Sequence, residues 1–585
     1  MAKKNVFIII LLIAAVMTAA ICFLVYTKPV EIFLDMANNK EPDRQFLASL
    51  YNNKENYEDV FSKLPEVSEK IDIKAGVISH HFLAKELIAD FYNKIGNKNI
   101  DTIFLVSPDH YNKFFPSGVI AYTSSSTWQT PFGNLYANKD IVNSLIKQRQ
   151  IESNDSAVGL EHGIYIEIPF IKNFFPNAKI VPLVLNSATA SDNFSELGTE
   201  LKNLAGDNSI LIVSSDFSHD ISAKTAGLND KDSIKILKDL PTEKIKDINS
   251  DCTRCIFVLS GFLENAQNYK FNLIDNKNSF DYSEDPLAGS GHSKDSVTSY
   301  VSGFWSERKD IQILFVGDLM FDRGIRYYAQ KNGSNEYIFD KIYSLLVNND
   351  LVLANLEGPI TDEKSVSAGT AIGSKNNYFF TFDPSVAETL YRENIKLVGL
   401  ANNHILNFGQ EGLNSTKKYL SEASISYFGA PEGNRTIIKE MSGIKIAFIS
   451  YNQFYGNQNL EEKSVLENIE KNKSEADFVI VFCHWGVEYD TEPIDSIKDL
   501  AHKFIDQGAD LVVGSHPHVI VPMETYNGKR IYYSLGNFIF DQYFDQNVRN
   551  GMGLILKIDL QTKQLQFEEK RLYLQSGGQT VEVSD

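Results

Sequence analysis

The chain has 585 residues, of which 43% are hydrophobic and 22% charged, so it is globular in composition and too long for one core; two or three domains are expected. Lys and Arg number 56 against 75 Asp and Glu, and the formal net charge of −19 argues against nucleic acid as a partner. Only four Cys are present, and Cys22 lies in an apolar run, which excludes a disulfide framework.

The N-terminal region predicts a membrane anchor. An uncharged apolar run, Val6–Tyr26, follows Lys3 and Lys4 and can span roughly 30 Å as a helix. The lysines predict a cytoplasmic N-terminus, so we interpret residues 1–28 as a cytoplasmic tip and transmembrane anchor, with single-pass membrane localisation and both domains outside the cytoplasm. A cleaved signal peptide is the alternative, although no A-x-A-like site ends the run. Residues 29–70 are polar and charged and are expected to form a stalk.

From about residue 71, apolar strand-like runs alternate with helical patterns, which predicts an α/β domain with a mainly parallel sheet over residues 71–305. Polar side chains that suit a metal or catalytic site follow several of these runs: His80, His110, Asp216 and His219. Glu161 and His162 add another polar pair. Because the carboxyl ends of parallel strands meet at one edge, we expect a common pocket. Each single His could also be a hydrogen-bonded structural residue. Cys252 and Cys255 could form a disulfide or a redox pair.

Several stretches of this half resemble the Memo-like family, the protein B of AmmeMemoRadiSam systems: AGVISHH, IFLVSPDH, WQTPFGNL, EHGIYIEIPF, IVPLVLN, LIVSSDFSH and DSVTSYVSGFW. The resemblance implies a fold similar to LigB-type dioxygenases. It also implies one metal ion, with iron favoured, on three ligands: His80, His110 and Cys252. Asp216 and His219 are then candidate catalytic residues in the same pocket. Ser79 and Tyr165 depart from the family pattern, which usually has Pro and a second Glu at these positions.

A polar stretch, residues 306–310, is expected to link this half to a second domain over residues 311–585. Apolar runs in the second half end in residues that can bind metal ions: Asp318, Glu357, Asn403 with His404, His484, and His516 with His518. Such a mixed oxygen and nitrogen set suits two ions, Mn, Zn or Fe, bridged by a carboxylate. For the His-Pro-His loop alone, a surface turn that happens to contain two His is an equal alternative.

The second half resembles the CapA family of capsule and poly-γ-glutamate synthesis proteins in the stretches GDLMFDRG, ANLEGPI, LANNHILNFG, FCHWGVEY, GSHPHV and SLGNFIFD. The resemblance implies a calcineurin-like metallophosphatase fold, a four-layer α/β sandwich. In that fold an Asn-His pair divides the work, so Asn403 is expected to bind metal and His404 to act on the leaving group. The remaining ligands are then Asp318, Glu357, His484, His516 and His518. Met320 stands where ordinary phosphoesterases have a His ligand.

Together the two resemblances imply a membrane-anchored metal-dependent hydrolase in the synthesis or attachment of a capsule or poly-γ-glutamate-type polymer. Its expected partners are the membrane, the envelope polymer or its precursor, and capsule-synthesis membrane proteins. The alternative is a non-catalytic module that holds polymer carboxylates on its ions, joined to a redox iron domain. His404 favours the hydrolase, because a carboxylate clamp needs no general acid or base.

Overall fold

The computed structural model describes residues 46–583, with gaps at 68–70, 96–98, 112–114, 117, 148–149, 189–191, 283–292 and 432. The predicted membrane span, Val6–Tyr26, lies outside the described residues. Among the helices of the described part, none is both long and apolar enough to cross a bilayer.

The first half is built on one mixed sheet, which has eleven strands in the described part, with the main order β1-β5-β6-β8-β3-β9-β2-β11-β10. Its strands are β1 (Phe46–Ala48), β2 (Ala75–Ile78), β3 (Thr102–Pro108), β4 (Ala121–Thr123), β5 (Thr127–Thr130), β6 (Gly133–Ala137), β7 (Ile151–Ser153), β8 (Lys179–Leu185), β9 (Ser209–Ser214), β10 (Tyr269–Asn278) and β11 (Ser299–Glu307). Its helices are α2 (Glu55–Phe61), α3 (Lys85–Ile95), α4 (Lys139–Ile146), α5 (Asp155–Leu160), α6 (His162–Tyr165), α7 (Glu167–Phe174), α8 (Asp192–Leu204), α9 (Ala223–Asp239) and α10 (Thr253–Leu263).

The centre of this sheet is parallel and buried on both faces. Strands β8, β3, β9 and β2 pair in parallel, and every residue of β3 is buried. Alternate side chains serve opposite faces: Phe104 and Val106 join one apolar core with α8 and α10, and Ile103 and Leu105 join a second core with α3 and α7. Continuous apolar strands between helices are typical of parallel sheets, and the expected α/β class is confirmed.

Part of the expected stalk, residues 29–70, belongs to this folded half instead. Strand β1 pairs in parallel with β5, and α2 packs on α3. This segment folds onto the domain because its aromatic side chains pack there. Tyr57 is fully buried, and its ring contacts the rings of Phe61, Phe82 and Phe170. These buried rings outweigh the polar composition of the surrounding segment.

The second half contains two sheets, with orders β15-β14-β13-β12-β23-β24-β25, to which β22 adds, and β16-β17-β18-β19-β21-β20. Its strands are β12 (Asp310–Leu319), β13 (Leu351–Leu356), β14 (Leu397–Gly399), β15 (Ser426–Phe428), β16 (Thr436–Met441), β17 (Ile444–Asn452), β18 (Phe478–His484), β19 (Leu511–Ser515), β20 (Ile520–Tyr526), β21 (Lys529–Leu535), β22 (Asn537–Ile539), β23 (Asn550–Asp559), β24 (Leu565–Leu574) and β25 (Thr580–Glu582). Its helices are α11 (Arg323–Lys331), α12 (Tyr343–Val347), α13 (Ser385–Arg392), α14 (Gly409–Glu422), α15 (Gln458–Asn472), α16 (Asp495–Gln507) and α17 (Gln546–Arg549).

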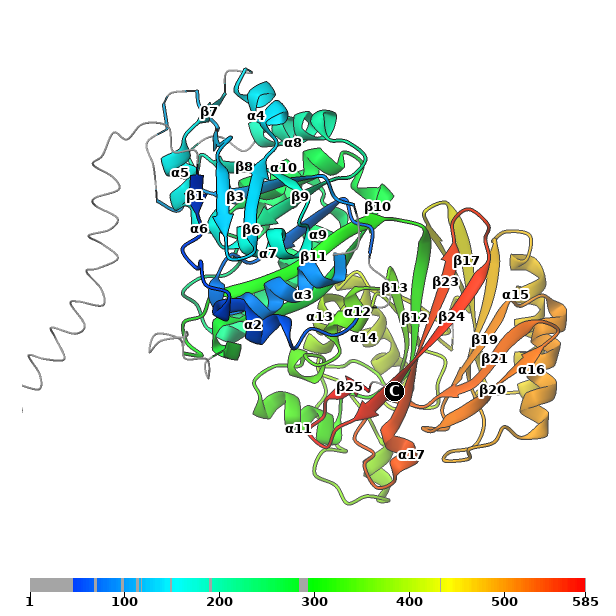
Figure 1. The fold of residues 1–585 in the computed structure, drawn as a ribbon. Coiled ribbons are helices and arrows are strands. Elements are labelled where there is room, and N and C mark those ends of the chain that lie inside the picture. Colours follow the sequence, from blue (N-terminus) through cyan, green and yellow to red (C-terminus); the bar gives the residue numbers. More distant parts are fainter. Residues whose placement is uncertain are drawn as a thin grey trace, which may run out of the picture.

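The two sheets of the second half face each other (Figure 1). Between them lies an apolar core that includes Phe315 from β12, Phe448 from β17 and Val513 from β19. Further cores on the outer faces join the first sheet to α11, α13 and α14 and the second sheet to α15 and α16. The half is therefore a helix–sheet–sheet–helix sandwich of four layers.

The two halves are joined by a short connection and a packed interface. Strand β11 ends at Glu307 and β12 begins at Asp310. Tyr343 and Val347 of α12 belong to the same apolar cluster as the core of the first half. Lys231 of α9 donates to Glu393, which follows α13, at 2.6 Å, and the Glu393 side chain is fully buried. A buried charge pair and shared apolar packing indicate that the halves form one unit.

Candidate metal centres

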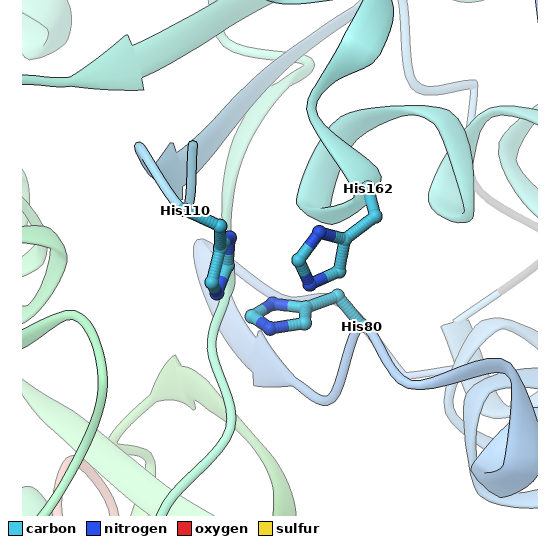
Figure 2. Close-up of side chains that lie close together, drawn as sticks. All are labelled: His80, His110 and His162. Carbon is cyan, nitrogen blue, oxygen red and sulfur yellow. The ribbon is translucent and has the colours of Figure 1, made fainter. Parts of the chain in front are cut away.

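Three imidazoles converge at the carboxyl edge of the sheet of the first half, and Figure 2 shows the three side chains pointing toward one another. His80 follows β2, His110 follows β3 and His162 opens α6. The ring centroids lie 4.7 Å apart for His80 and His110, 4.8 Å for His80 and His162, and 3.9 Å for His110 and His162. Their candidate ligand atoms all lie within 4.8 Å of one another, so the three could hold one ion.

Two carboxylates lie against this imidazole cluster. Asp251 Oδ2 is 3.1 Å from Nε2 of His80 and 3.3 Å from Nε2 of His110, and Asp216 Oδ2 is 3.7 Å from Nε2 of His80. Burial alone would lower the pKa of His80, but Asp216 and Asp251 outweigh it and raise the pKa to about 10. Burial and the two neighbouring imidazoles lower the pKa of His162 to about 3. Negative charge is therefore concentrated around His80, as a cation site requires.

Glu161 fixes the orientation of His110. Its Oε1 lies 2.7 Å from Nδ1 of His110, and its Oε2 accepts from the backbone N–H of the same residue at 3.0 Å. A carboxylate at Nδ1 makes this nitrogen the donor and leaves the lone pair on Nε2, which faces Asp251. A lone pair and a carboxylate oxygen 3.3 Å apart are favourable neighbours only with a cation or a proton between them.

Cys252, the expected third ligand, does not join the cluster. Its sulfur is bonded to the sulfur of Cys255, so the disulfide is the alternative that the structure contains. A disulfide sulfur carries no thiolate charge and is not the ligand that a metal ion needs. Asp251, one residue earlier, lies beside His80 in its place. Sequence reasoning missed Asp251, although a carboxylate next to an expected ligand was the available signal.

The two expected catalytic residues of this half lie on different sides of the cluster. Asp216 is buried, and its Oδ1 accepts from Ser79 Oγ at 2.6 Å and from the backbone N–H of His80 at 3.3 Å. His219 is 43% exposed, and its Nε2 lies 3.8 Å from Asp251 Oδ2. Asp216 thus orients His80 from the buried side, and His219 lies on the exposed side of the cluster.

In the second half, three ligand-type side chains meet at the carboxyl ends of strands from both of its sheets. Asp318 lies near the end of β12, Glu357 follows β13, and His518 follows β19. His518 Nδ1 is 3.3 Å from Asp318 Oδ2, and its Nε2 is 3.7 Å from Glu357 Oε1. All three are buried, and their candidate ligand atoms lie within 4.8 Å of one another.

Within this cluster, the Glu357 carboxylate lacks hydrogen-bond partners in the described part of the chain. It is fully buried, and neither carboxylate oxygen has a hydrogen-bond partner among the described residues. Burial and the nearby Asp318 carboxylate raise the pKa of Glu357 well above its usual range. Burying a carboxylate without partners is costly, and two facing carboxylates need positive charge between them. Divalent cations fit this donor set.

The other expected ligands surround the same point. His484 Nε2 is 2.9 Å from Asn403 Oδ1, and His516 Nδ1 is 3.2 Å from His484 Nε2. Burial and the neighbouring imidazoles lower the pKa of both His484 and His516, the latter to about 3. Neutral imidazoles are the form that binds metal ions. Asn355, which the sequence did not single out, donates to Asp318 Oδ1 at 2.7 Å and holds that carboxylate in place.

The backbone around the cluster is tightly constrained. His516 and His518 have φ values of 99° and 59°, in the left-handed region that side chains with a Cβ rarely adopt. A Cβ at Gly317 would lie 1.7 Å from the carbonyl oxygen of Gly536, so only Gly lets β12 pass so close to this loop. Strained backbone of this kind is typical of functional sites.

His404 stands beside the cluster with a defined tautomer. Asn407 Oδ1 accepts from the backbone N–H of Phe380 at 2.8 Å and lies 3.1 Å from Nδ1 of His404. Nδ1 is therefore the donor, and the lone pair lies on Nε2, which is 3.9 Å from Glu357 Oε1. Burial lowers the pKa of His404 to about 4. The imidazole is neutral at pH 7 and is arranged to accept a proton.

Arg323 is a second functional candidate that the sequence did not indicate. Its guanidinium lies 4.9 Å from the ring of Phe380 and 5.5 Å from the ring of Phe540. These rings in turn contact His404 at 4.4 Å and His518 at 4.7 Å. Arg323 has a positive φ of 48°, and its buried Nε has no partner among the described residues. The side chain therefore places a cation and a spare donor beside the cluster.

Both halves thus carry His, Asp and Glu clusters at the carboxyl edge of a sheet, which defines an α/β protein with two candidate metal centres. Residues 40–302 match the family model of Memo-like protein, and residues 312–542 match that of bacterial capsule synthesis protein PGA_cap. The chain carries a Memo-like domain followed by a CapA-like domain.

Relatives of both domains are recognisable. The PGA biosynthesis protein CapA of Bacillus subtilis is 32% identical over 39% of this chain, and the capsule biosynthesis protein CapA of Bacillus anthracis is 30% identical over 40%. The matches span 63% and 61% of these two relatives. A MEMO1 family protein of Thermoplasma volcanium is 28% identical over 33% of this chain and 73% of its own length.

Proposed function

We propose that the CapA-like domain is a metal-dependent hydrolase that acts on anionic linkages or groups of an envelope polymer. The observation that carries this proposal is Glu357: its buried carboxylate lies beside Asp318 and His518, and neither oxygen has a hydrogen-bond partner among the described residues. Asp318, Glu357, Asn403, His484, His516 and His518 would hold two divalent ions, of Mn, Zn or Fe. When bound, such ions act as Lewis acids and lower the pKa of a water ligand.

The protein's own groups then divide the remaining tasks. His404 accepts a proton at Nε2, because its Nδ1 is committed to Asn407 and its low pKa keeps it neutral. Asn355 holds Asp318 in one orientation. Arg323 attracts the anionic group of the substrate through its positive charge and its remaining N–H donors, while Asp541 and the two Phe rings keep the guanidinium in place.

The Memo-like domain is proposed to hold one further ion on His80, His110 and Asp251, with His162 beside them. Two imidazoles and one carboxylate are the ligand set that suits non-haem Fe(II), so iron is the favoured metal. This places Asp251 in the role expected for Cys252.

Residues 1–28 are proposed to anchor the protein in the membrane, so that both domains face outward. Protease added to intact spheroplasts should then degrade both domains.

The hydrolase proposal is tested with the full chain and added Mn²⁺, Zn²⁺ or Fe²⁺. Chromogenic phosphomonoesters, phosphodiesters and poly-γ-glutamate serve as substrates. We expect metal-dependent turnover of at least one of them, and Arg323→Gln should raise KM for it more than it lowers kcat. Its matched control is Arg571→Gln, which changes an exposed Arg on β24. Metal-dependent polymer binding without hydrolysis of any substrate would instead support the non-catalytic module.

A further inference from the structure

A pocket of about 390 Å³ lies between the two domains, away from both metal clusters. The Memo-like side contributes the end of α9 and the start of β10, and the CapA-like side contributes residues 348–350 and Lys396. Residues 348–350 directly precede β13, and Lys396 directly precedes β14. The pocket therefore lies at the amino edge of this sheet, and Asp318 and Glu357 lie at its carboxyl edge. Its volume is in the range of ligand clefts, roughly 300–1,000 Å³.

The lining of this interdomain pocket is cationic in a strongly acidic protein. Its cationic residues are Lys235, Lys238, Lys244, Lys270, Arg308 and Lys396. Its acidic residues are Asp232, Asp239, Asp247 and Asp350. Six cations against four carboxylates give a net charge of +2, whereas the chain as a whole carries −19. The pocket is therefore a place where the protein attracts anions.

Two of the carboxylates already have partners. Asp350 accepts from Arg308 at 2.6 Å and from the backbone N–H of Gln312 at 2.8 Å. Asp232 lies 3.3 Å from the ammonium of Lys235. Asp350 also attracts Lys270 and Lys238 from a longer distance. Among the described residues, no carboxylate lies within ion-pair distance of the ammonium groups of Lys238, Lys270 or Lys396.

Three lysines remain for a ligand. Lys270 is only 8% exposed, and within the described ranges its ammonium has neither a hydrogen bond nor an ion pair. The ammonium of Lys396 also lacks such a partner there and lies 6.0 Å from the ring of Tyr391. Among the described residues, Lys238 donates to the carbonyl oxygens of Val347 and Asn349, at 2.6 and 3.0 Å, and to no carboxylate. The ammonium groups of Lys270 and Lys396 are therefore available to a ligand, and Lys238 adds a positive charge with no carboxylate in direct contact.

This arrangement is unfavourable without a ligand. Burial and the neighbouring Lys396 lower the pKa of Lys238 to about 7, and burial also lowers the pKa of Lys270. Asp350 offsets part of this effect at both lysines, but the net lowering shows that their charged forms remain disfavoured. Buried cations without a carboxylate in contact cost stability, whereas apolar residues of similar size would not. Lys238 has a structural role, because it connects α9 to the segment before β13. Lys270 and Lys396 form no such connection, so a structural role does not account for them.

We propose that this pocket binds a multiply charged oxyanion, carried on phosphate or carboxylate groups, between Lys238, Lys270 and Lys396. Lysine ammonium groups suit such anions because each is a compact charge with three donors. The bound anion contacts both domains and so ties the Memo-like domain to the CapA-like domain. The site is separate from the metal clusters and does not depend on the proposed hydrolase activity.

The test uses the full chain with inorganic phosphate and, separately, tri-γ-glutamate, at constant ionic strength set with NaCl. Binding is measured by calorimetry, and stability by the midpoint of thermal unfolding. Both measurements are repeated in the Glu357→Gln background, where anions bound by ions at that cluster are removed. Binding of only one of the two probes identifies phosphate or carboxylate as the group recognised.

We expect at least one probe to bind and to raise the unfolding midpoint, and Lys270→Met and Lys396→Met each to weaken binding roughly tenfold. Lys471→Met, which changes an exposed lysine on α15, should bind like the wild type. Without any anion, Lys270→Met should be more stable than the wild type, because it removes a buried charge that has no carboxylate in direct contact. The proposal is overturned if neither probe binds, if Lys270→Met binds as tightly as the wild type, or if Lys270→Met is less stable without anions.

Discussion

We expect the Glu357→Gln variant to be more stable than the wild type without metal and less stable than the wild type with metal. Without metal, the Glu357 side chain is a fully buried carboxyl group next to Asp318, and its oxygens accept no hydrogen bond from the part of the chain that the structure describes. Because its pKa is raised in the folded protein, the stability it contributes is present below pH 4.5 and is lost as the pH rises, by about 1.4 kcal/mol per unit, until the raised pKa is reached. Gln has the same shape and does not ionise, so metal-free Glu357→Gln should be the more stable protein at pH 7.

With metal, the order should invert. A divalent ion present at about 100 times its dissociation constant stabilises the folded state by about 2.7 kcal/mol. For a domain of this size, this corresponds to an increase of roughly 5–10 °C in the unfolding midpoint. Glu357→Gln loses the proposed bridging ligand, so its midpoint should not move at the same metal concentration.

The assay is thermal unfolding of both proteins at pH 7, after chelation and after addition of Mn²⁺ or Zn²⁺, with metal content measured in parallel. Glu475→Gln, which changes an exposed Glu, is the matched control and should behave like the wild type in both states. A metal-dependent increase that persists in Glu357→Gln would refute the role of Glu357 as a ligand. If metal-free Glu357→Gln unfolds at a lower temperature than the wild type, the claim that the buried carboxylate destabilises the metal-free protein is wrong.

Three further predictions concern single residues. His404→Gln should keep the metal-dependent shift in unfolding midpoint but lose turnover by about 10²–10⁴-fold, and loss of the metal would contradict its role as a base. Asp251→Asn should remove the ion of the Memo-like domain, as measured by metal analysis and the iron spectrum, whereas Cys252→Ser should retain it; the opposite result would restore the thiolate ligand. Burial raises the pKa of Glu167 to about 8, so its contribution to stability is complete below pH 4.5 and is lost as the pH rises to about 8. The loss amounts to roughly 5 kcal/mol, and Glu167→Gln should abolish this dependence in unfolding titrations; an unchanged pH profile would show that Glu167 is not the cause.

Much of the candidate site could be predicted because strand ends are visible in the sequence. Apolar runs that stop at a ligand-type residue placed His80, His110, Asp318 and Glu357 at sheet edges, and parallel pairing brings such ends together. The order of strands within a sheet is a long-range property that the sequence pattern does not contain.

Local pattern also could not decide between neighbouring candidates. Asp251 and Cys252 are adjacent, and the backbone at the start of α10 determines which of them reaches the imidazoles. Local pattern also fails at Arg323, because an isolated Arg after a strand predicts an exposed charge. Only the packing of Phe380 and Phe540, which come from distant segments, places it beside His404. The polar segment around Tyr57 was misread for the same reason, since its aromatic partners lie elsewhere in the chain.

The interface that joins α9 to α12 and α13 makes the two domains thermodynamically dependent on each other. Cutting the chain between Arg308 and Lys309 would leave Glu393 without Lys231 and would uncover Tyr343, so each separated half would lose stability that the intact chain retains. Unfolding of one domain therefore exposes the interface surface of the other domain to water. An ion that binds only to the CapA-like cluster should raise the temperature at which the Memo-like domain unfolds, and a chelator should lower it, although no ligand atom lies in that domain.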